Sequence, residues 1–234
     1  MKKLSKYAIV DYRTSEETID NLKKYFCKVI FTKPVNTYEA ICGHADISVC
    51  KISDNHIITC PSLYEYYKNE LPDINVMSGS FEPLKCYPDD VYYNAACYGD
   101  TAIHNFKYTD KITLAVIEQK FSKRINVRQG YSKCSVCFVN SGAIITDDDG
   151  IAKKAANHNI EVLKISKGKV LLKGMDYGFF GGATGTYKDK IFLNGSLDTL
   201  DESKEIKMFL KKHDIELIEL KSGAIEDIGS IICI

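Results

Sequence analysis

The segment FVNSGAIITDDDGIAKKAANHNIEVLKI, residues 138–165, contains one complete unit of alternating strands and helix. It opens with small and polar residues at 138–142, and an apolar strand follows. A helix is predicted over 148–157 because its apolar residues recur on one face at helical spacing. The apolar positions of this helix are Ile151, Ala152, Ala155 and Ala156. The β-branched run at 160–165 then predicts a closing strand, so the unit is strand, strand, helix, strand.

The same order of patterns recurs along the whole chain. Each further amphipathic helix is followed by a brief β-branched run, and Ser15 is a typical N-cap for the first of them. The further predicted helices cover residues 15–25, 63–71, 112–121 and 200–212, and the strands after them centre on 29–31, 74–76, 125–127 and 215–218. The helices end about 37 to 54 residues apart, which is typical of a repeated structural unit.

A strand pair is predicted before each helix, and its first strand carries small or polar residues. These openings lie at 42–46, 97–101, 138–142, 180–184 and 227–230. The last opening has no helix after it, whereas the first helix has only the strand Tyr7–Val10 before it. Pairing of the two terminal strands would complete a fifth unit and remove exposed strand edges. The sequence thus predicts a closed, five-bladed α/β-propeller, with an open α/β sheet as the alternative.

Length and composition favour one globular domain over residues 1–234. The chain is 45% hydrophobic and 26% charged, which is enough apolar sequence for one full core. Lys plus Arg and Asp plus Glu both number 31, so the bulk charge disfavours nucleic acid and membrane surfaces as partners. A homodimer is compatible with the sequence.

The expected location is the cytoplasm. The basic start, Met1–Lys6, is followed by only a three-residue apolar run before Asp11, which is too short for a signal peptide. No later segment has the uninterrupted apolar length that crosses a bilayer. Nine cysteines, an odd number, fit reduced thiols better than a disulfide framework.

Five such units around a ring resemble the pentein fold, whose members include arginine and agmatine deiminases, dimethylarginine hydrolases and amidinotransferases. His44-Ala45-Asp46 is similar to the His-x-Asp of these enzymes, in which the histidine is an acid/base and the aspartate holds the guanidinium. Residues 229–233, GSIIC, resemble the glycine-led segment that ends in their nucleophilic cysteine. The stretches 129–134 and 178–182 resemble an uncharacterised bacterial branch of the same fold.

The resemblance implies an amidino- or guanidino-group hydrolase with a cysteine nucleophile. A thiolate attacks the guanidinium carbon, a histidine protonates the leaving amine, and carboxylates bind the cation through paired hydrogen bonds. His44 and Asp46 are two residues apart on a predicted strand, so both side chains should face the same way. Cys233 is the nucleophile by the C-terminal motif, and Cys134 competes because it lies two units after His44, as in the enzymes.

Further residues are candidate contacts to a substrate. These are Asn94, Gln129, Lys133, Glu226 and Asp227. Lys133 is expected on the opposite side of a strand from Cys134 because the two residues are adjacent. The lone pair Cys134-x-x-Cys137 lacks two further zinc ligands, so neither a metal nor a cofactor is expected.

The expected ligand is a small cationic or amide-bearing metabolite in the central pore. The alternative is a non-catalytic ring that keeps the pocket for ligand binding or uses the scaffold for protein contact. Convergence of His44, Asp46 and one cysteine in a central cavity would favour the enzyme.

Overall fold

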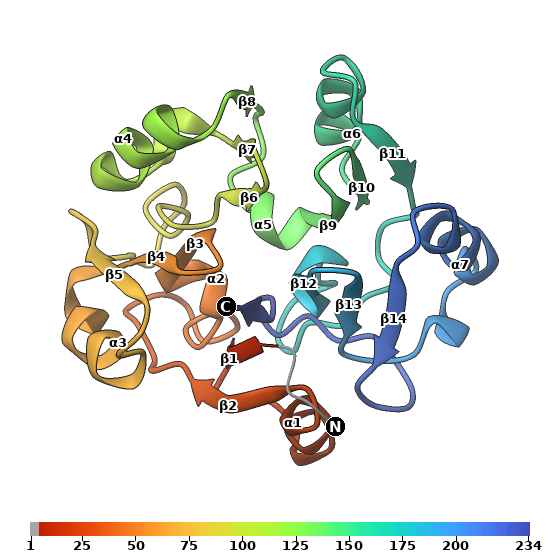
Figure 1. Cartoon of the computed structure of the whole chain (residues 1–234), viewed down its shortest axis with the longest axis horizontal. Coiled ribbons are helices and arrows are strands. Elements are labelled where there is room, and N and C mark those ends of the chain that lie inside the picture. Colours follow the sequence, from red (N-terminus) through yellow and green to blue (C-terminus); the bar gives the residue numbers. More distant parts are fainter. Residues whose placement is uncertain (1–4) are drawn as a thin grey trace.

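The computed structural model describes residues 5–234, and the first four residues of the basic N-terminal start lie outside this range. The described residues contain five three-stranded sheets. In each sheet the middle strand pairs antiparallel with one neighbour and parallel with the other. Figure 1 shows the antiparallel neighbour towards the middle of the molecule, as an inner strand, and the parallel neighbour towards the rim, as an outer strand.

Each sheet thus has an inner, a middle and an outer strand. In that order, the strands of the five sheets are β3 (Val49–Ser53), β4 (His56–Thr59) and β5 (Asn75–Ser78); β6 (Ala96–Tyr98), β7 (Thr101–His104) and β8 (Lys123–Asn126); β9 (Val136–Asn140), β10 (Ala143–Thr146) and β11 (Glu161–Lys164); β12 (Thr184–Tyr187), β13 (Lys190–Leu193) and β14 (Glu216–Glu219); β15 (Ile232–Cys233), β1 (Ser5–Val10) and β2 (Phe26–Phe31).

A helix connects the middle strand of each sheet to its outer strand, because parallel neighbours require a crossover. These helices are α1 (Glu16–Lys23), α3 (Tyr64–Glu70), α4 (Lys111–Lys120), α6 (Asp149–Ala156) and α7 (Ser203–Lys212). The side chains of Ser15, Asp110 and Asp148 cap three of them by accepting a backbone N–H of the first turn. The helices predicted from the sequence are confirmed, with small shifts at their ends.

The apolar core continues from sheet to sheet through the inner strands. Val49 of β3 and Ile232 of β15 belong to one cluster, and Ala96 of β6 and Val136 of β9 belong to another. Two further clusters connect β9 with the sheet of β13, and β13 with β1. Each sheet therefore shares buried apolar side chains with its neighbours, and Figure 1 shows the sheets grouped around the middle of the molecule.

The two terminal strands lie in the same sheet, as expected. β1 pairs antiparallel with β15, with Ala8 opposite Cys233 and Ile9 opposite Ile232. Tyr7 extends this ladder, because its N–H donates to Ile234 O at 2.8 Å and its carbonyl accepts from Ile234 N–H at 3.0 Å. The fifth unit is thus assembled from both ends of the chain.

The predicted strand over 42–46 is wrong. Residues Ala45–Ser48 form a short helix, α2, and β3 begins only at Val49. His44 precedes the helix, whose end is marked by a hydrogen bond from Val49 N–H to Ala45 O, and the N–H of Asp46 donates to Gly229 O at 3.1 Å. His44 and Asp46 therefore do not lie on one face of a strand.

The other openings also differ from the prediction. Residues 97–101 and 138–142 contain the hairpin turns between inner and middle strands. Residues 180–184 contain a short 3₁₀ helix, η3 (Gly181–Ala183), and 227–230 form a loop before β15. The openings at 97–101 and 138–142 thus contain the turns that follow inner strands, whereas those at 180–184 and 227–230 contain segments that precede inner strands.

No helix within residues 5–234 has the length and apolar character that a membrane span requires. The helices α4 and α7 have ten residues each, against about 20 for a spanning helix. All nine cysteines lie in the described part of the chain and are free thiols.

Replacement of Ile232 by Ala tests the contribution of the terminal strand pair. Ile232 is 2% exposed and lies opposite Ile9, so the variant should lose about 2–5 kcal/mol of unfolding free energy. Urea unfolding measures the loss. Met208→Ala is the control, since Met208 is 64% exposed on α7 and should change stability by less than about 0.5 kcal/mol. Equal losses of unfolding free energy in the two variants would contradict a stabilising contribution from the buried pairing of β1 with β15.

Candidate active site

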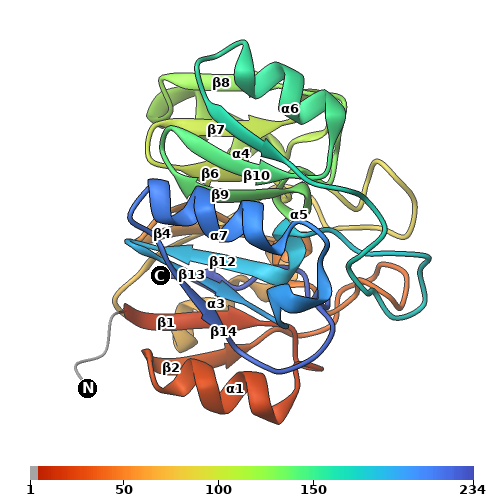
Figure 2. The same ribbon diagram turned by 90° about the vertical axis from the view of Figure 1, so that its right-hand side faces the viewer.

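Five chain segments meet near one end of the inner strands and form the candidate site. Each segment lies just before an inner strand. They are α2, the turn at Asn94, α5 (Ser132–Ser135), η3 and the loop 227–230. Figure 2 shows α5 on the opposite side of the molecule from the C-terminus.

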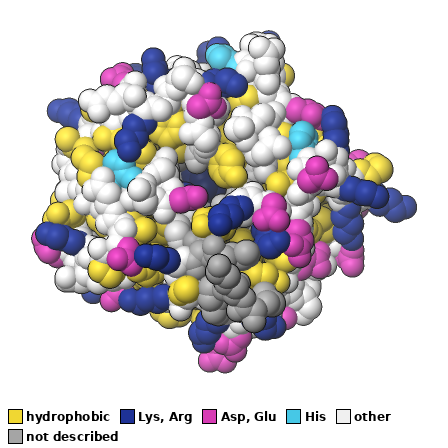
Figure 3. Space-filling model, in the orientation of Figure 1, with side chains coloured by type: hydrophobic (Ala, Val, Ile, Leu, Met, Phe, Trp, Pro, Cys, Tyr) yellow, Lys and Arg dark blue, Asp and Glu magenta, His cyan; other side chains and the backbone are white. Residues whose placement is uncertain are grey.

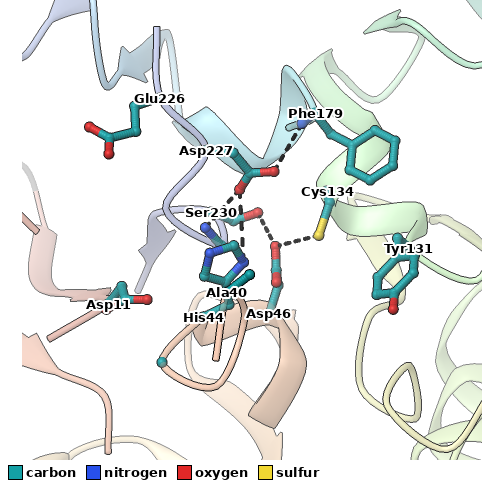
Figure 4. Close-up of polar contacts among 12 residues, drawn as sticks. Asp11, Ala40, His44, Asp46, Tyr131, Cys134, Phe179, Glu226, Asp227 and Ser230 are labelled. Carbon is teal, nitrogen blue, oxygen red and sulfur yellow. Dashed lines mark hydrogen bonds and ion pairs between the residues drawn. The ribbon is translucent and has the colours of Figure 1, made fainter. Parts of the chain in front are cut away.

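The carboxylate of Asp46 lies at the centre of the site and is fully buried. Its Oδ2 accepts a hydrogen bond from Ser230 Oγ at 2.5 Å, and Cys134 Sγ donates to the same oxygen at 3.1 Å (Figure 4). A buried carboxylate requires such donors to compensate for lost hydration. Asp46 thus joins α2, α5 and the C-terminal loop, which are distant in the sequence.

Asn94 fixes the position of Cys134. Its side-chain N–H groups donate to Cys134 Sγ at 3.2 Å and to the backbone carbonyl of Asp46 at 3.1 Å. Its side-chain oxygen accepts the backbone N–H of Lys133 at 2.8 Å and of Cys134 at 3.3 Å. The amide therefore holds both the backbone and the thiol of Cys134.

A second buried carboxylate, Asp227, faces His44. It accepts the backbone N–H groups of Phe179 and Gly229, each at 2.9 Å, and His44 Nδ1 lies 3.9 Å from its Oδ1 (Figure 4). Gly229 allows this approach, because a Cβ there would lie 2.1 Å from the Cβ of His44. The backbone of the C-terminal loop therefore packs directly on the histidine.

Burial raises the pKa of the Cys134 thiol well above its usual value, and the charges of Asp46 and Asp227 raise it further. Burial also raises the pKa of Asp227, an effect that His44 reduces. His44 Nδ1 and Asp46 Oδ1 are buried without a hydrogen-bond partner, which in a native structure requires an explanation such as a ligand. The free site thus holds a protonated thiol and unused hydrogen-bonding capacity.

A cavity of about 290 Å³ opens onto these groups. Its lining residues are Tyr38, Ile41, His44, Ile47, Tyr131, Cys134, Leu172, Met175, Asp176, Tyr177, Phe179 and Asp227. A second cavity of about 290 Å³ adjoins it, and His44 and Asp227 line both. The candidate site therefore contains His44, Cys134 and Asp227 at the wall of one cavity, with Asp46 directly behind the thiol.

The opposite face of the molecule, where the hairpin turns lie, is hollowed at its middle (Figure 3). The hollow has a volume of about 330 Å³ and is lined in part by Lys51 and Lys188. A narrower space of about 30 Å³ is lined by Lys51, Lys133 and Cys233. Lys133 and Cys233 thus line this inner space, whereas His44 and Cys134 line the cavity of the candidate site.

The structure does not bring Cys233 to His44. Cys233 is buried in β15, where its Sγ donates to Ile231 O at 3.6 Å, and burial raises its pKa to about 12. Of the two cysteines considered from the sequence, only Cys134 lies beside Asp46.

The strand predicted around Lys133 is wrong because residues 132–135 form the short helix α5, but Lys133 and Cys134 do line different cavities, as expected for side chains on opposite sides. The Nζ of Lys133 donates to Ser230 Oγ at 3.0 Å, on the side of Asp46 away from the cavity. Ser230 therefore connects the ammonium of Lys133 with the carboxylate of Asp46.

Gln129 and Glu226 lie at the edge of the site. Gln129 donates to Asp148 Oδ2 at 3.2 Å and accepts the N–H of Tyr131 at 3.0 Å, so it supports the turn before α5. Glu226 pairs with Lys221 at 2.7 Å and lines the adjoining cavity. Neither side chain lines the cavity that contains Cys134.

Sequence reasoning missed Ser230 and the aromatic wall of the cavity. Ser230 directly follows the glycine of the C-terminal motif, and its φ of 66° places it in the left-handed region that favours glycine. Tyr131 and Phe179 lie within the two stretches, 129–134 and 178–182, that resemble other proteins of the fold. The signal for these residues was thus present, but the sequence did not show which of them face the cavity.

A family model described as "Family of unknown function (DUF6873)" matches residues 9–232. The chain belongs to this family. No curated protein matches the sequence of this DUF6873 member.

Solved structures resemble the DUF6873 chain at low sequence identity. Dimethylarginine dimethylaminohydrolase (DDAH) from Pseudomonas aeruginosa, in complex with citrulline, has 8% identity and a TM-score of 0.56, with 99% of this chain and 100% of that chain covered. C. jejuni agmatine deiminase has 9% identity and a TM-score of 0.56, with 94% and 88% covered. An amidinotransferase of the saxitoxin pathway from Microseira wollei has 11% identity and a TM-score of 0.52, with 97% and 94% covered. The resemblance to the pentein fold is confirmed.

Replacement of Gly229 by Ala tests the contact between the C-terminal loop and His44. Gly229 has a φ of 69°, and Gly223 has a φ of 79° with nothing within 4 Å of an added Cβ. Both Ala variants should lose about 1–2 kcal/mol from left-handed strain. Gly229→Ala should lose about 1–3 kcal/mol more, because its Cβ overlaps His44. Urea unfolding of the two variants measures the difference, and equal losses would argue against close packing of the loop on the histidine.

The raised pKa of Cys134 predicts how its alkylation depends on pH. Iodoacetamide reacts with the thiolate, so labelling of Cys134 in the folded protein should have its midpoint at a higher pH than in urea-unfolded protein. Asp46→Asn removes a negative charge and should lower the midpoint of the folded protein. Peptide-resolved mass spectrometry measures labelling, and circular dichroism checks that the fold persists. A folded-state midpoint below the unfolded one would disagree with the expected protonation state.

Proposed function

We propose that this DUF6873 member is an amidino- or guanidino-group hydrolase of the deiminase type, with Cys134 as its nucleophile. The observation that carries the proposal is that Cys134, Asp227 and His44 line one cavity, with Asp46 hydrogen-bonded to the thiol from behind. The proposed scaffold is a closed five-bladed propeller, supported by the pairing of β1 with β15. Nine free thiols support a cytoplasmic location.

The two carboxylates are proposed to bind the cationic group of the substrate. Asp46 Oδ1 is buried and has no hydrogen-bond partner, and Asp227 lines the cavity. A planar guanidinium or amidinium offers paired N–H donors that match carboxylate oxygens. A bound cation would also offset the two negative charges that raise the pKa of Cys134. The substrate itself would therefore favour formation of the thiolate.

The proposed reaction is hydrolysis of one C–N bond. The sulfur of Cys134 gives its proton to His44 and forms a bond to the central carbon of the substrate, and the C–N bond to the leaving amine breaks as His44 passes that proton to the nitrogen. His44 then accepts a proton from water, whose oxygen attacks the same carbon. The C–S bond breaks as the sulfur takes back the proton from His44, and the products are a free amine or ammonia and an amide- or urea-type compound. Asp227, which faces His44, would orient the imidazole.

The protonated state of Cys134 favours a second candidate function, a non-catalytic binding site for the same cations. Burial and two neighbouring carboxylates keep the thiol neutral in the free site. If a bound cation does not lower the pKa of Cys134 far enough, the same residues bind the ligand without cleaving it. The enzyme is the preferred proposal because His44 and the thiol of Cys134 line the same cavity.

Labelling with chloroacetamidine tests the enzyme proposal. Its amidinium should occupy the position between Asp46 and Asp227 and bring the chloromethyl carbon to the sulfur of Cys134. Near neutral pH, Cys134 should react at least about tenfold faster in the folded protein than in urea-unfolded protein, because the bound cation lowers its pKa. The exposed thiol of Cys27 is the internal control and should show no such acceleration.

Two variants and one assay separate the enzyme from the binding site. Asp46→Asn should abolish the acceleration at Cys134 and leave Cys27 unchanged. Release of ammonia or amine from a panel of guanidines and amidines should be lost in Cys134→Ser. Accelerated labelling without any release across the panel would favour the binding site, and absence of both would refute the two candidates together.

A further inference from the structure

The outer part of the cavity restricts which amidines fit the site. We infer that the site takes an amidine or guanidine whose substituent is apolar or aromatic and carries no carboxylate. The inference rests on the proposed function only for the position of the cationic head. The substituent preference follows from the residues that line the rest of the cavity.

One wall of the cavity is aromatic. The rings of Tyr131 and Phe179 stack with centroids 6.3 Å apart, and Tyr177 meets Phe179 edge-on at 6.2 Å. Phe179 also donates its backbone N–H to Asp227, so the wall begins directly beside the carboxylate. A substituent attached to the cationic head is therefore expected to lie along the faces of these rings.

The hydroxyl groups of Tyr131 and of the neighbouring Tyr38 are already used. Tyr131 donates its O–H to Asp90 Oδ2 at 2.5 Å. Its hydroxyl oxygen lies 2.9 Å from that of Tyr38, so Tyr38 must donate in that contact. Neither tyrosine has a hydroxyl hydrogen left for an anionic group of a ligand.

The cavity also lacks a Lys or Arg side chain, among the described residues, that could pair with a carboxylate. Its lining instead includes Asp176 and Asp227. Arg13 of the adjoining cavity is fully engaged, since it donates to both carboxylate oxygens of Asp11 and to the carbonyls of Glu39 and Ala40. A carboxylate on a substituent that lies in the Cys134 cavity would lose hydration without gaining a Lys or Arg partner, which is unfavourable.

Apolar side chains are exposed at the mouth of the cavity. Met175 is 49% exposed and Tyr177 is 41% exposed, and both line the cavity. Leu171, at the start of the same loop, is 57% exposed. Exposed large apolar side chains that gather at the mouth of a cavity are typical of a binding surface. An apolar substituent would cover Met175 and Tyr177.

Three reactive probes test the inference: unsubstituted chloroacetamidine, its N-benzyl derivative and its N-carboxyethyl derivative. The measured quantity is the second-order rate of labelling at Cys134, resolved by mass spectrometry. The N-benzyl probe should react about tenfold or more faster than the unsubstituted probe, because a ring is buried on the aromatic wall. The N-carboxyethyl probe should react no faster than the unsubstituted one. Equal rates for all three, or preference for the carboxylate, would overturn the inference while the hydrolase proposal stands.

Matched variants test which residues cause the preference for the N-benzyl probe. Met175→Ser combined with Tyr177→Ser should bring the rate of the N-benzyl probe close to that of the unsubstituted probe, whereas Met208→Ser, an exposed methionine on α7, should leave the ratio unchanged. Asp176→Lys should raise the rate of the N-carboxyethyl probe. Lys173 lines the adjoining cavity. If Lys173→Ala, and not the double variant, removed the preference for the N-benzyl probe, the substituent would lie in that cavity and the inference would be overturned.

Equilibrium binding separates this inference from the proposed function. Calorimetry compares benzylguanidine with 4-guanidinobutyrate, neither of which alkylates a thiol. Suppose that no probe labels Cys134 faster in the folded protein than in unfolded protein, but that benzylguanidine binds at least about tenfold more tightly than 4-guanidinobutyrate. The hydrolase proposal then fails, and the inferred ligand class stands. If neither compound binds and no probe reacts, both fail.

Discussion

The buried carboxylate of Asp46 is the constraint on which the site depends. Its oxygen accepts hydrogen bonds from Ser230 and Cys134, and these two residues belong to segments of different sheets. Removal of either donor would leave a charge in an apolar interior with less compensation, which costs on the order of several kcal/mol. The sheets bring the chain segments close together, and this carboxylate determines their final approach. The reactive groups of the site are therefore also the groups that hold it together.

The helices could be predicted from the sequence because their signals are local. Ser15 and Asp148 cap the helices that follow them, and the apolar positions recur at helical spacing. The helical turn of α2 could not be predicted, because it has only four residues, too few to show a helical period, and its Asp46 N–H donates to Gly229 O, far along the chain. The choice between the two cysteines was open for a similar reason. It depends on which end of an inner strand each thiol occupies, and a motif in one segment does not contain that information.

Structures that are only 8 to 11% identical share this architecture. A three-stranded sheet with one crossover helix requires an apolar pattern and glycine at close approaches, and many sequences meet those requirements. In the enzymes that the chain resembles, the histidine lies in a central unit and the cysteine about two units later. In this chain His44 lies in the first complete unit, and Cys134 again lies two units later. The proposed site would thus keep the spacing of two units between its histidine and its cysteine.

The pairing of β1 with β15 has a mechanical consequence. Tyr7 and Ile234 form the outermost contact of this ladder, so both chain ends leave it on the same side. A pull on the two ends would unzip the ladder one contact at a time instead of shearing all contacts at once. The next segment released would be the loop that carries Ser230 and Asp227. Force on the chain ends would therefore take apart the pocket before it reached the remaining four sheets.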